Sequence, residues 1–243
     1  MVVEIDHVRF AWITGQRDTL DITRMEIAAG ERVFVEGPSG SGKSTLFSML
    51  GGVVCPREGT VRVLGTDISR MPAGKRDRFC ADHIGFVFQM FNLVPYLSLI
   101  DNVVLPCRFS LRRFERARTR SRSPEAKAHR LLARLGLEPT ELHGGRTVAE
   151  LSIGQQQRVA IARGLIGAPE LILADEPTSA LDEGTRERFL EVLSESSMRS
   201  GRLPAWPCST SHCWSASQSS PASSACICRS PCLDLRTGGS FRR

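Results

Sequence analysis

A glycine-rich segment at residues 37–44 has the composition of a loop that binds phosphate groups. It reads Gly-Pro-Ser-Gly-Ser-Gly-Lys-Ser and fits the pattern G-x-x-x-x-G-K-S/T, with an apolar run before it and a helical pattern after it. The glycines let successive backbone N–H groups turn toward phosphate oxygens, and the start of the helix adds positive potential. We predict that Lys43 binds the β- and γ-phosphates of a nucleotide and that Ser44 is a ligand of Mg²⁺. The residues expected to contact the nucleotide here are Gly37, Pro38, Ser39, Gly40, Ser41, Gly42, Lys43, Ser44 and Thr45.

Two adjacent carboxylates, Asp175 and Glu176, follow the apolar run 171–174. Because side chains alternate along a strand, the two carboxylates point in different directions and can do different work. One can hold Mg²⁺ through water while the other polarises an attacking water, which is the division of roles that phosphoryl transfer needs. Strands often end in acidic residues, so the pair is informative only together with the phosphate-binding loop.

The elements that position these residues alternate between strand and helix up to about residue 198, which predicts an α/β fold. Apolar patterns predict strands at 3–10, 20–27, 33–35, 60–63, 84–88 and 171–174. Helical patterns lie at about 43–52, 73–82, 155–166 and 183–199. Residues 98–150 break this rhythm, because they are helix-rich and basic. We expect them to form a separate helical lobe inserted into the α/β core.

A third segment, residues 151–163, resembles the signature motif of the ATP-binding-cassette (ABC) ATPases. It reads Leu-Ser-Ile-Gly-Gln-Gln-Gln-Arg-Val-Ala-Ile-Ala-Arg, and the resemblance extends over about residues 1–200 with every landmark in order. The landmarks are Trp12 as the aromatic that stacks on adenine, the phosphate-binding loop, Gln89 as the Q-loop glutamine, the signature, Asp175 with Glu176, and Asp182 in the D-loop. One departure is Ile153, which stands where the family has a glycine and adds bulk beside a phosphate contact.

The resemblance implies a P-loop NTPase core with an N-terminal antiparallel β subdomain and an inserted α-helical subdomain at about 90–155, within a cassette of residues 1–198. It also implies a head-to-tail dimer of two cassettes. ATP and Mg²⁺ held by one copy, through Lys43, Ser44 and Asp175, would be closed over by Ser152, Gly154 and Gln155 of the other. Glu176 would activate water, Gln89 would sense Mg²⁺ and relay to a membrane partner, and Asp182 would link the two sites.

A finer resemblance is to the single-domain cassettes of the lipoprotein-release and macrolide-export type. It rests on Leu-Gly-Gly-Val at 50–53 and on Phe-Gln-Met-Phe-Asn-Leu-Val-Pro at 88–95. It implies an ATP-hydrolysing subunit, peripheral on the inner face of the cell membrane, that powers a separate permease chain. The alternatives are a soluble ABC ATPase acting on nucleic acid or the ribosome, and a cassette that binds ATP without hydrolysing it well.

Several residues also have plainer interpretations. Trp12 could be an edge-strand aromatic that covers the sheet, and Gln89 an ordinary loop amide. Ser152 with Gly154 could simply cap a helix, which is compatible with a phosphate-binding role. The six arginines between positions 112 and 122 could contact acidic elements of the permease or anionic lipid, but we favour a solvated helix face.

Composition excludes several classes of protein. The chain has 243 residues, of which 41% are hydrophobic and 24% charged, so disorder, collagen and a disulfide-stapled miniprotein are excluded. No apolar run reaches the roughly 18–20 residues of a membrane-spanning helix, and the start lacks a signal-peptide pattern, so we expect a cytoplasmic protein. Residues 199–243 contribute six arginines and one acidic residue to the net charge of +6, which leaves the body nearly neutral. We therefore expect no nucleic-acid partner, and reduced, structural cysteines at positions 55, 80 and 107.

Residues 199–243 do not match the family. The family has a buried strand after the helix predicted at 183–199, followed near position 208–210 by a switch histidine that contacts the γ-phosphate. Pro204 and Pro207 forbid a central strand there, and the remainder lacks either periodicity. We expect a disordered tail read from a shifted frame, and poor hydrolysis. The alternatives are His212 as a displaced switch and a zinc site from Cys208, His212, Cys213, Cys226, Cys228 and Cys232.

Overall fold

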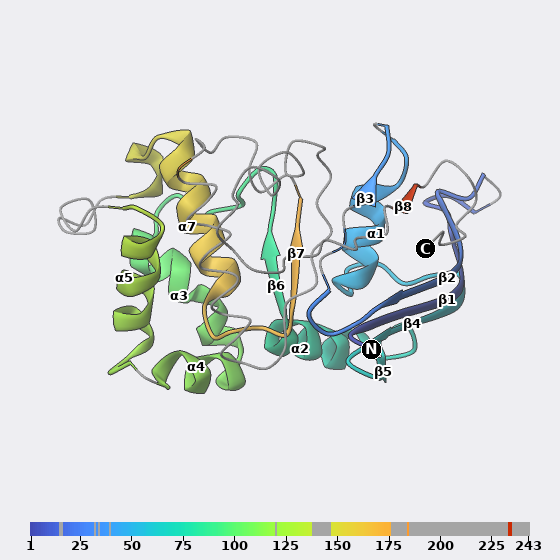
Figure 1. Cartoon of the computed structure of the whole chain (residues 1–243), viewed down its shortest axis with the longest axis horizontal. Helices are drawn as coiled ribbons and strands as arrows, with labels where there is room; N and C mark the ends of the chain where they lie inside the picture. Colours follow the sequence, from blue (N-terminus) through green and yellow to red (C-terminus); the bar gives the residue numbers. More distant parts are fainter. Residues whose placement is uncertain are drawn as a thin grey trace, which may run out of the picture. The chain divides into compact units, whose positions relative to one another are not determined.

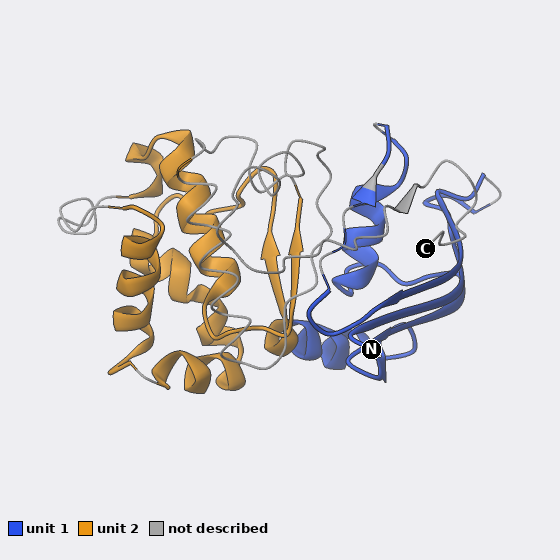
Figure 2. Cartoon of the chain, viewed as in Figure 1, with its two compact units in different colours: residues 1–80, 205–243 blue, residues 81–204 orange. Residues whose placement is uncertain are grey.

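Figure 1 shows the path of the chain in a computed structural model. The structure describes residues 1–14, 17–31, 33, 35–38, 40–119, 121–137, 147–175, 184 and 233–234. The chain divides into two compact units, Met1–Cys80 with Ala205–Arg243 and Ala81–Pro204 (Figure 2). Four of the residues expected in the site lie outside the described residues: Ser39, Glu176, Asp182 and His212. The predicted helix at 183–199 also lies outside them, apart from residue 184.

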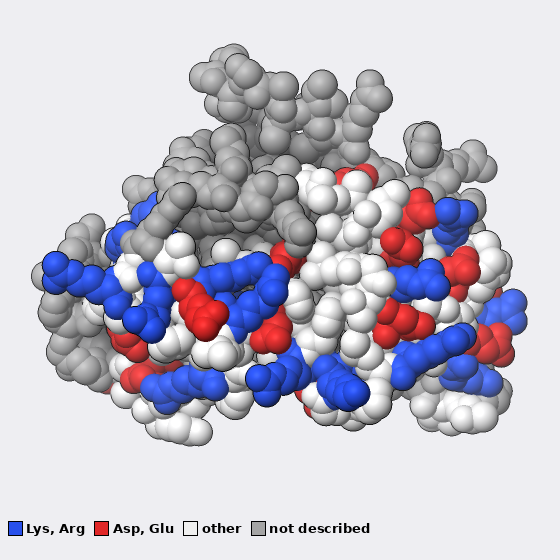
Figure 3. All heavy atoms as spheres, turned by 90° about the horizontal axis from the view of Figure 1, so that it is seen from below, with Lys and Arg blue, Asp and Glu red and all other residues white. Residues whose placement is uncertain are grey.

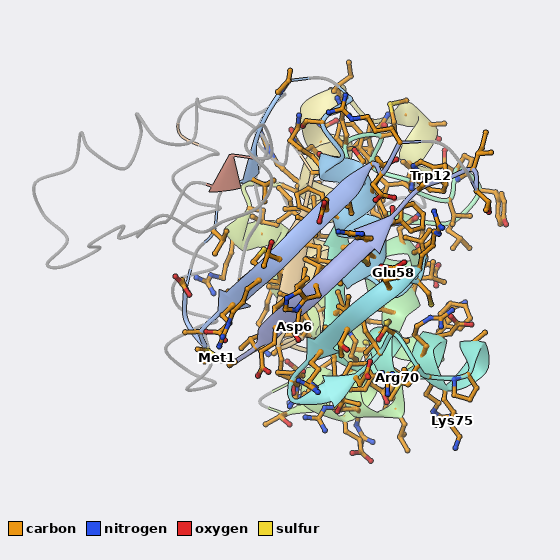
Figure 4. The ribbon with its side chains drawn as sticks, turned by 90° about the vertical axis from the view of Figure 1, so that its right-hand side faces the viewer. Met1, Asp6, Trp12, Glu58, Arg70 and Lys75 are labelled. Carbon is orange, nitrogen blue, oxygen red and sulfur yellow. The ribbon has the colours of Figure 1, made fainter. Side chains whose placement is uncertain are left out.

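The first unit contains a four-stranded antiparallel sheet in the order β2-β1-β4-β5. Its strands are β1 (Val3–Phe10), β2 (Leu20–Ile27), β4 (Glu58–Val63) and β5 (Thr66–Asp67). Figure 4 shows the long strands side by side, with Trp12 at the opposite end of the sheet from Met1. The alternation predicted from the sequence is confirmed, because every second or third side chain is buried, including Val3, Ile5, Val8, Ile22, Ile27, Val61 and Val63.

A bulge where β1 meets β4 shifts the register between Asp6 and Arg9. His7 takes a left-handed conformation there, with φ of 48°, and Gly59 opposite it has φ of 85°. A Cβ on Gly59 would lie 2.3 Å from the carbonyl oxygen of His7, so only glycine allows this close approach.

The same unit holds β3 (Val35–Glu36) and helix α1 (Lys43–Leu50), which buries Leu46, Phe47, Met49 and Leu50. Helix α1 ends at Leu50, with Gly51 as its C-cap, slightly earlier than the predicted 43–52. Helix α2 spans Ala73–His83, and the boundary between the two units falls within it. Within residues 199–243, where the sequence predicts a disordered tail, Leu233–Asp234 form a short strand, β8, that pairs in parallel with β3.

The second unit is built on two parallel strands, β6 (Ile84–Val87) and β7 (Leu171–Ala174), in which Ile84 pairs with Leu171 and Val87 with Ala174. Helix α7 (Ile153–Leu165) packs on β6. The approach is close, because a Cβ on Gly85 would lie 2.2 Å from the carbonyl oxygen of Gly164. Helix α7 begins two residues before the predicted 155, because Ser152 caps it.

The described parts of residues 98–150 are mostly helical, as predicted. They form α3 (Leu99–Phe109), α4 (Leu111–Arg118), α5 (Pro124–Arg134) and a short 3₁₀ turn, η1 (Val148–Glu150). A serine side chain accepts a backbone N–H at the start of each α-helix: Ser98, Ser110 and Ser123. Helix α3 packs against α4, α5 and α7. The limits of a helical subdomain at about 90–155 stay a prediction.

The arginine-rich stretch differs from the expected solvated face. Arg113 is buried, with 3% of its surface exposed, while Arg112 and Arg116 form ion pairs with the buried side chain of Glu170. Figure 3 shows that basic and acidic side chains also lie next to one another elsewhere on the face in view. The favoured interpretation was therefore wrong for Arg113, because its partners are backbone carbonyls that a charge pattern does not reveal.

Candidate nucleotide-binding site

The phosphate-binding loop connects β3 to α1, as the motif requires. Gly40 and Gly42 have φ of 78° and 95°, in the left-handed region that favours glycine. A Cβ on Gly42 would lie 2.8 Å from Cδ2 of Leu20 and 2.8 Å from the carbonyl oxygen of Thr19. Both the backbone conformation and the space therefore require glycine at position 42.

Two polar groups of this loop are suited to phosphate. The ammonium of Lys43 folds back over the loop and donates to the carbonyl oxygens of Gly37, at 2.7 Å, and Pro38, at 3.1 Å. The hydroxyl of Ser41 is buried, and among the described residues it has no hydrogen-bond partner. A buried hydroxyl without a partner is costly, and a phosphate oxygen is a partner of the right chemistry. The loop thus fits a nucleotide phosphate.

The start of α1 is open toward an anion. Gly42 provides no side-chain cap, and the first turn of the helix contains no acidic residue. The N–H groups at a helix start carry a partial positive charge, which favours a negatively charged ligand. Ser44, in this first turn, is exposed.

Trp12 lies next to this helix. Its side chain is 63% exposed, and its indole Nε1 donates to Oγ1 of the buried Thr45 over 3.3 Å. Phe10 packs edge-on against it, with ring centroids 5.1 Å apart. The indole is therefore held in place while much of it remains accessible, which suits stacking on a planar base. The hydroxyl oxygen of Thr45, a residue expected at the nucleotide, accepts this hydrogen bond.

Gln89 and Asp175 follow the ends of the two parallel strands of the second unit. Gln89 comes two residues after β6 and is exposed, while Asp175 comes directly after β7 and is half-buried. The backbone N–H of Asp175 donates to the carbonyl oxygen of Val87 over 2.9 Å, which joins the two strand ends. Ligands commonly bind beyond the carboxyl ends of parallel strands, so this edge is a suitable place for catalytic side chains.

The loop after Gln89 contains a feature that the sequence did not predict. Phe91 and Asn92 have φ of 59° and 48°, which is uncommon for residues other than glycine. Arg163 of α7 donates to the carbonyl oxygens of both residues, at 2.6 Å to that of Asn92. Arg163 is buried, and burial lowers its pKa. The asparagine is the single sequence signal for such a turn, because asparagine tolerates this conformation better than most residues.

The signature segment forms the start of α7. Oγ of Ser152 accepts from the N–H of Gln155 at 3.3 Å, and the N–H of Ser152 donates to Oε1 of Gln155 at 2.9 Å. This reciprocal capping confirms the helix-cap interpretation of Ser152. Ile153 is the first helical residue, and its side chain is 64% exposed. The isoleucine thus fits the backbone without strain, and Gly154 follows it within the helix.

The cysteines at positions 55, 80 and 107 are reduced, as expected. Cys55, Cys80 and Cys107 are free thiols, and burial raises the pKa of Cys80 and of Cys107 to about 11. No group of three or more His, Cys, Asp or Glu side chains in the described part of the chain could hold a metal ion. The cysteines and the histidine of the alternative zinc site lie outside the described residues.

Taken together, the strand, the glycine-rich loop and the open helix start define an α/β nucleotide-binding protein of the P-loop class. Residues 20–179 match the family model described as ABC transporter. The chain belongs to this family.

Relatives support this assignment. The chain is 42% identical over 176 residues to the lipoprotein-releasing system ATP-binding protein LolD 2 of Rhodospirillum rubrum, covering 72% of each chain. It is 40% identical over 195 residues to the macrolide export ATP-binding/permease protein MacB of Chromobacterium violaceum, covering 79% of this chain and 29% of MacB. A solved dimeric structure of the ATP-binding cassette MJ0796 in a post-hydrolysis state, bound to ADP and Pi, is similar with a TM-score of 0.73 and 32% identity, covering 86% of this chain and 88% of that one.

Proposed function

We propose that this chain binds Mg-ATP and hydrolyses it to power a separate membrane permease of the lipoprotein-release or macrolide-export type. The observation that carries the proposal is the phosphate-binding loop, with Lys43 folded over it and the unpartnered hydroxyl of Ser41 within it. The similarity to LolD and MacB relatives favours this type of transporter.

The nucleotide would be bound at two ends. Lys43 and the N–H groups at the start of α1 neutralise the phosphates, and the exposed indole of Trp12 stacks on adenine. Ser44, Asp175 and Gln89 would hold Mg²⁺, since hydroxyl, carboxylate and amide oxygens are the ligands that this ion prefers. Bound Mg²⁺ would supply charge neutralisation at the phosphate oxygens.

Hydrolysis would depend on Glu176, which lies outside the described residues. As the residue directly after Asp175, it would accept a proton from the attacking water. The backbone hydrogen bond from the N–H of Asp175 to the carbonyl oxygen of Val87 holds the strand end at Asp175 in place. Gln89 would link the occupied site to the permease.

The functional unit would be a dimer of two copies, as in the dimeric structures of MJ0796. Ser152, Gly154 and Gln155 at the start of α7 would close over the nucleotide bound by the other copy, and Asp182 would link the two sites. The exposed position of Ser152 and Ile153 supports this role, because an accessible capped helix start can meet a phosphate.

The permease would be a separate chain. Among the helices that the structure describes, none has the length and apolar character to span a bilayer. LolD relatives are named as ATP-binding proteins of a releasing system, and MacB carries ATP-binding and permease functions in one protein. We place the chain at the inner face of the cell membrane, bound to its permease.

A second candidate function is a cassette that binds ATP but hydrolyses it slowly. It is favoured by Pro204 and Pro207, where the family has a strand leading to its switch histidine. One experiment separates the candidates: Mg-ATP binding and turnover of the purified chain are measured together, with Lys43→Ala as the binding-deficient control. Binding with turnover supports the leading proposal, and binding with negligible turnover supports the second. Failure to recover a permease with the tagged chain from its native membranes would contradict the transporter role.

A further inference from the structure

One arginine of the helical insertion contacts the far end of the signature helix. Arg113 lies on α4, and its guanidinium donates hydrogen bonds to four backbone carbonyls. The carbonyl of Ile166 accepts from Nε at 2.9 Å and from Nη2 at 2.7 Å. Nη2 also donates to the carbonyls of Gly164, at 2.9 Å, and Arg163, at 3.3 Å. Nη1 donates to the carbonyl of Ile84 at 3.2 Å. Burial lowers the pKa of Arg113 to about 10, so it is still charged at neutral pH.

These bonds complete the hydrogen bonding at the end of α7. The last four carbonyls of a helix have no partner within it. The carbonyls of Ala162 and Leu165 accept hydrogen bonds from backbone N–H groups that follow the helix, at 3.0 and 3.1 Å. The carbonyls of Arg163 and Gly164 accept hydrogen bonds from the guanidinium of Arg113. A cation from another helix thus caps the negative end of the signature helix, where positive charge is favoured.

The surrounding backbone is shaped to admit this arginine. Gly167 has φ of 72°, and a Cβ there would lie 2.6 Å from Cβ and 2.7 Å from the carbonyl oxygen of Arg113. A side chain at position 167 would therefore push α4 away. The close approach of α4 depends on this glycine as well as on the arginine.

A second cluster joins the same helix to the start of β7. The carboxylate of Glu170, directly before β7, accepts from Arg112 at 2.6 Å and Arg116 at 2.8 Å, and it shares a hydrogen bond of 3.1 Å with Nδ1 of His83. Its side chain is 3% exposed. Helix α4 is therefore bonded to β7 through Glu170 and to β6 and α7 through Arg113.

The connection continues to the Q-loop. Arg163, whose carbonyl accepts from Arg113, directs its own guanidinium to the carbonyls of Phe91 and Asn92. Strained left-handed residues persist only where surrounding contacts hold them. The end of α7 thus lies between Arg113 on one side and the turn after Gln89 on the other.

We infer that Arg113 is a positioning residue, which holds the signature helix α7 and the strand leading to Gln89 in one fixed arrangement with the helical insertion. A displacement of the insertion then moves the signature and the Q-loop together. The structural part of this inference is independent of the proposed ATPase function, and its kinetic consequence rests on that function.

The structural arm compares Arg113→Met with Arg118→Met by hydrogen exchange. Arg118 lies on the same helix but is exposed, over the ring of Phe114, so its variant is a matched control. We expect backbone amides of residues 84–92 and 159–166 to exchange about tenfold faster in Arg113→Met and unchanged in Arg118→Met, with residues 3–10 unchanged in both. A change confined to residues 111–118 would overturn the inference. If Arg113→Met does not fold, Arg113→Lys replaces it, because lysine keeps the charge with fewer donors and should give a smaller change in the same segments.

The kinetic arm uses the same variants with Mg-ATP. We expect Arg113→Met to lower kcat about five- to tenfold while KM stays within about twofold, because Lys43 and Trp12 are unaffected, and Arg113→Lys to recover part of the loss. Equal kinetics in Arg113→Met and the parent would contradict the inference. A parent without turnover would instead contradict the proposed ATPase function, and the exchange measurement would still decide the role of Arg113.

Discussion

Trp12 donates a hydrogen bond from its indole to the hydroxyl of Thr45, which lies in the first turn of the helix that follows the phosphate-binding loop. The residue expected to stack on adenine is thereby bonded to the helix whose start is expected to bind phosphate. The two ends of the proposed nucleotide site in this unit are therefore linked through one side-chain contact.

This link leads to a prediction for Trp12. Removing the ring in Trp12→Ala should weaken ATP binding about tenfold, since stacking on a planar base contributes about 1–2 kcal/mol. Trp12→Phe keeps an aromatic surface but loses the hydrogen bond to Thr45, so its affinity for ATP should lie between those of Trp12→Ala and the parent. Titration calorimetry with ATP and with inorganic triphosphate tests this, because triphosphate binding should be unaffected. Equal affinity for ATP in Trp12→Ala and the parent would support the plainer edge-strand interpretation.

The buried hydroxyl of Ser41 gives effects of opposite sign on stability and on binding. In the protein without nucleotide, Ser41→Ala removes a hydroxyl without a partner in the described part of the chain, so the free energy of unfolding should rise by about 1 kcal/mol. The same change removes a donor to phosphate and should weaken ATP binding about fivefold. Urea denaturation and nucleotide titration provide the two measurements. Ser48→Ala is the control, because its hydroxyl bonds a carbonyl within α1. A loss of stability in Ser41→Ala would show that the hydroxyl has a partner.

The assignment of Glu176 as general base predicts that binding and turnover separate. Glu176→Gln should bind Mg-ATP as the parent does but lower the rate of hydrolysis by at least about a hundredfold. Since the closed state is not discharged, the variant should also form dimers at saturating Mg-ATP. Size-exclusion chromatography with and without nucleotide measures this, and Lys43→Ala should remain monomeric. Hydrolysis at the parent's rate would remove Glu176 from the catalytic role.

The parts of the site that could be predicted from the sequence are those in which a local pattern determines local structure. The glycine-rich loop, the alternating strand at 3–10 and the cap at Ser152 each depend on neighbouring residues, and the structure has all three. The start of α7 was misplaced by two residues because Ile153 and Gly154 are weak helix formers, and the cap outweighs them.

Arg113 could not be predicted in the same way. In the sequence it is one of six arginines between 112 and 122, and such runs usually lie on a solvated face. Its partners are backbone carbonyls more than 25 positions away in sequence, and carbonyls have no signal in a residue pattern. The glycine at position 167 was the nearest indication, because a left-handed residue after a helix allows another segment to approach closely.

The buried cluster around Glu170 makes stability depend on acid pH. Burial by itself raises the pKa of Glu170, but hydrogen bonds with His83, Arg116 and Arg112 outweigh it and hold the pKa well below its usual range. Because the folded-state pKa is depressed, the carboxylate contributes its full stabilisation above the unfolded-state pKa of about 4.3, and this contribution is lost as pH falls below that value.

Glu170→Gln should therefore lower the free energy of unfolding by about 2 kcal/mol at pH 7, and the difference from the parent should shrink as pH falls below about 4. Glu115→Gln is the control, because Glu115 lies exposed on α4, the helix that carries Arg112 and Arg116, and its substitution should leave the profile unchanged. Urea denaturation followed by circular dichroism at several pH values between 3 and 7 gives the two profiles. The cluster has no such role if the Glu170→Gln and parent profiles run parallel across this range, because a carboxylate that stabilises the fold must lose that effect when it is protonated.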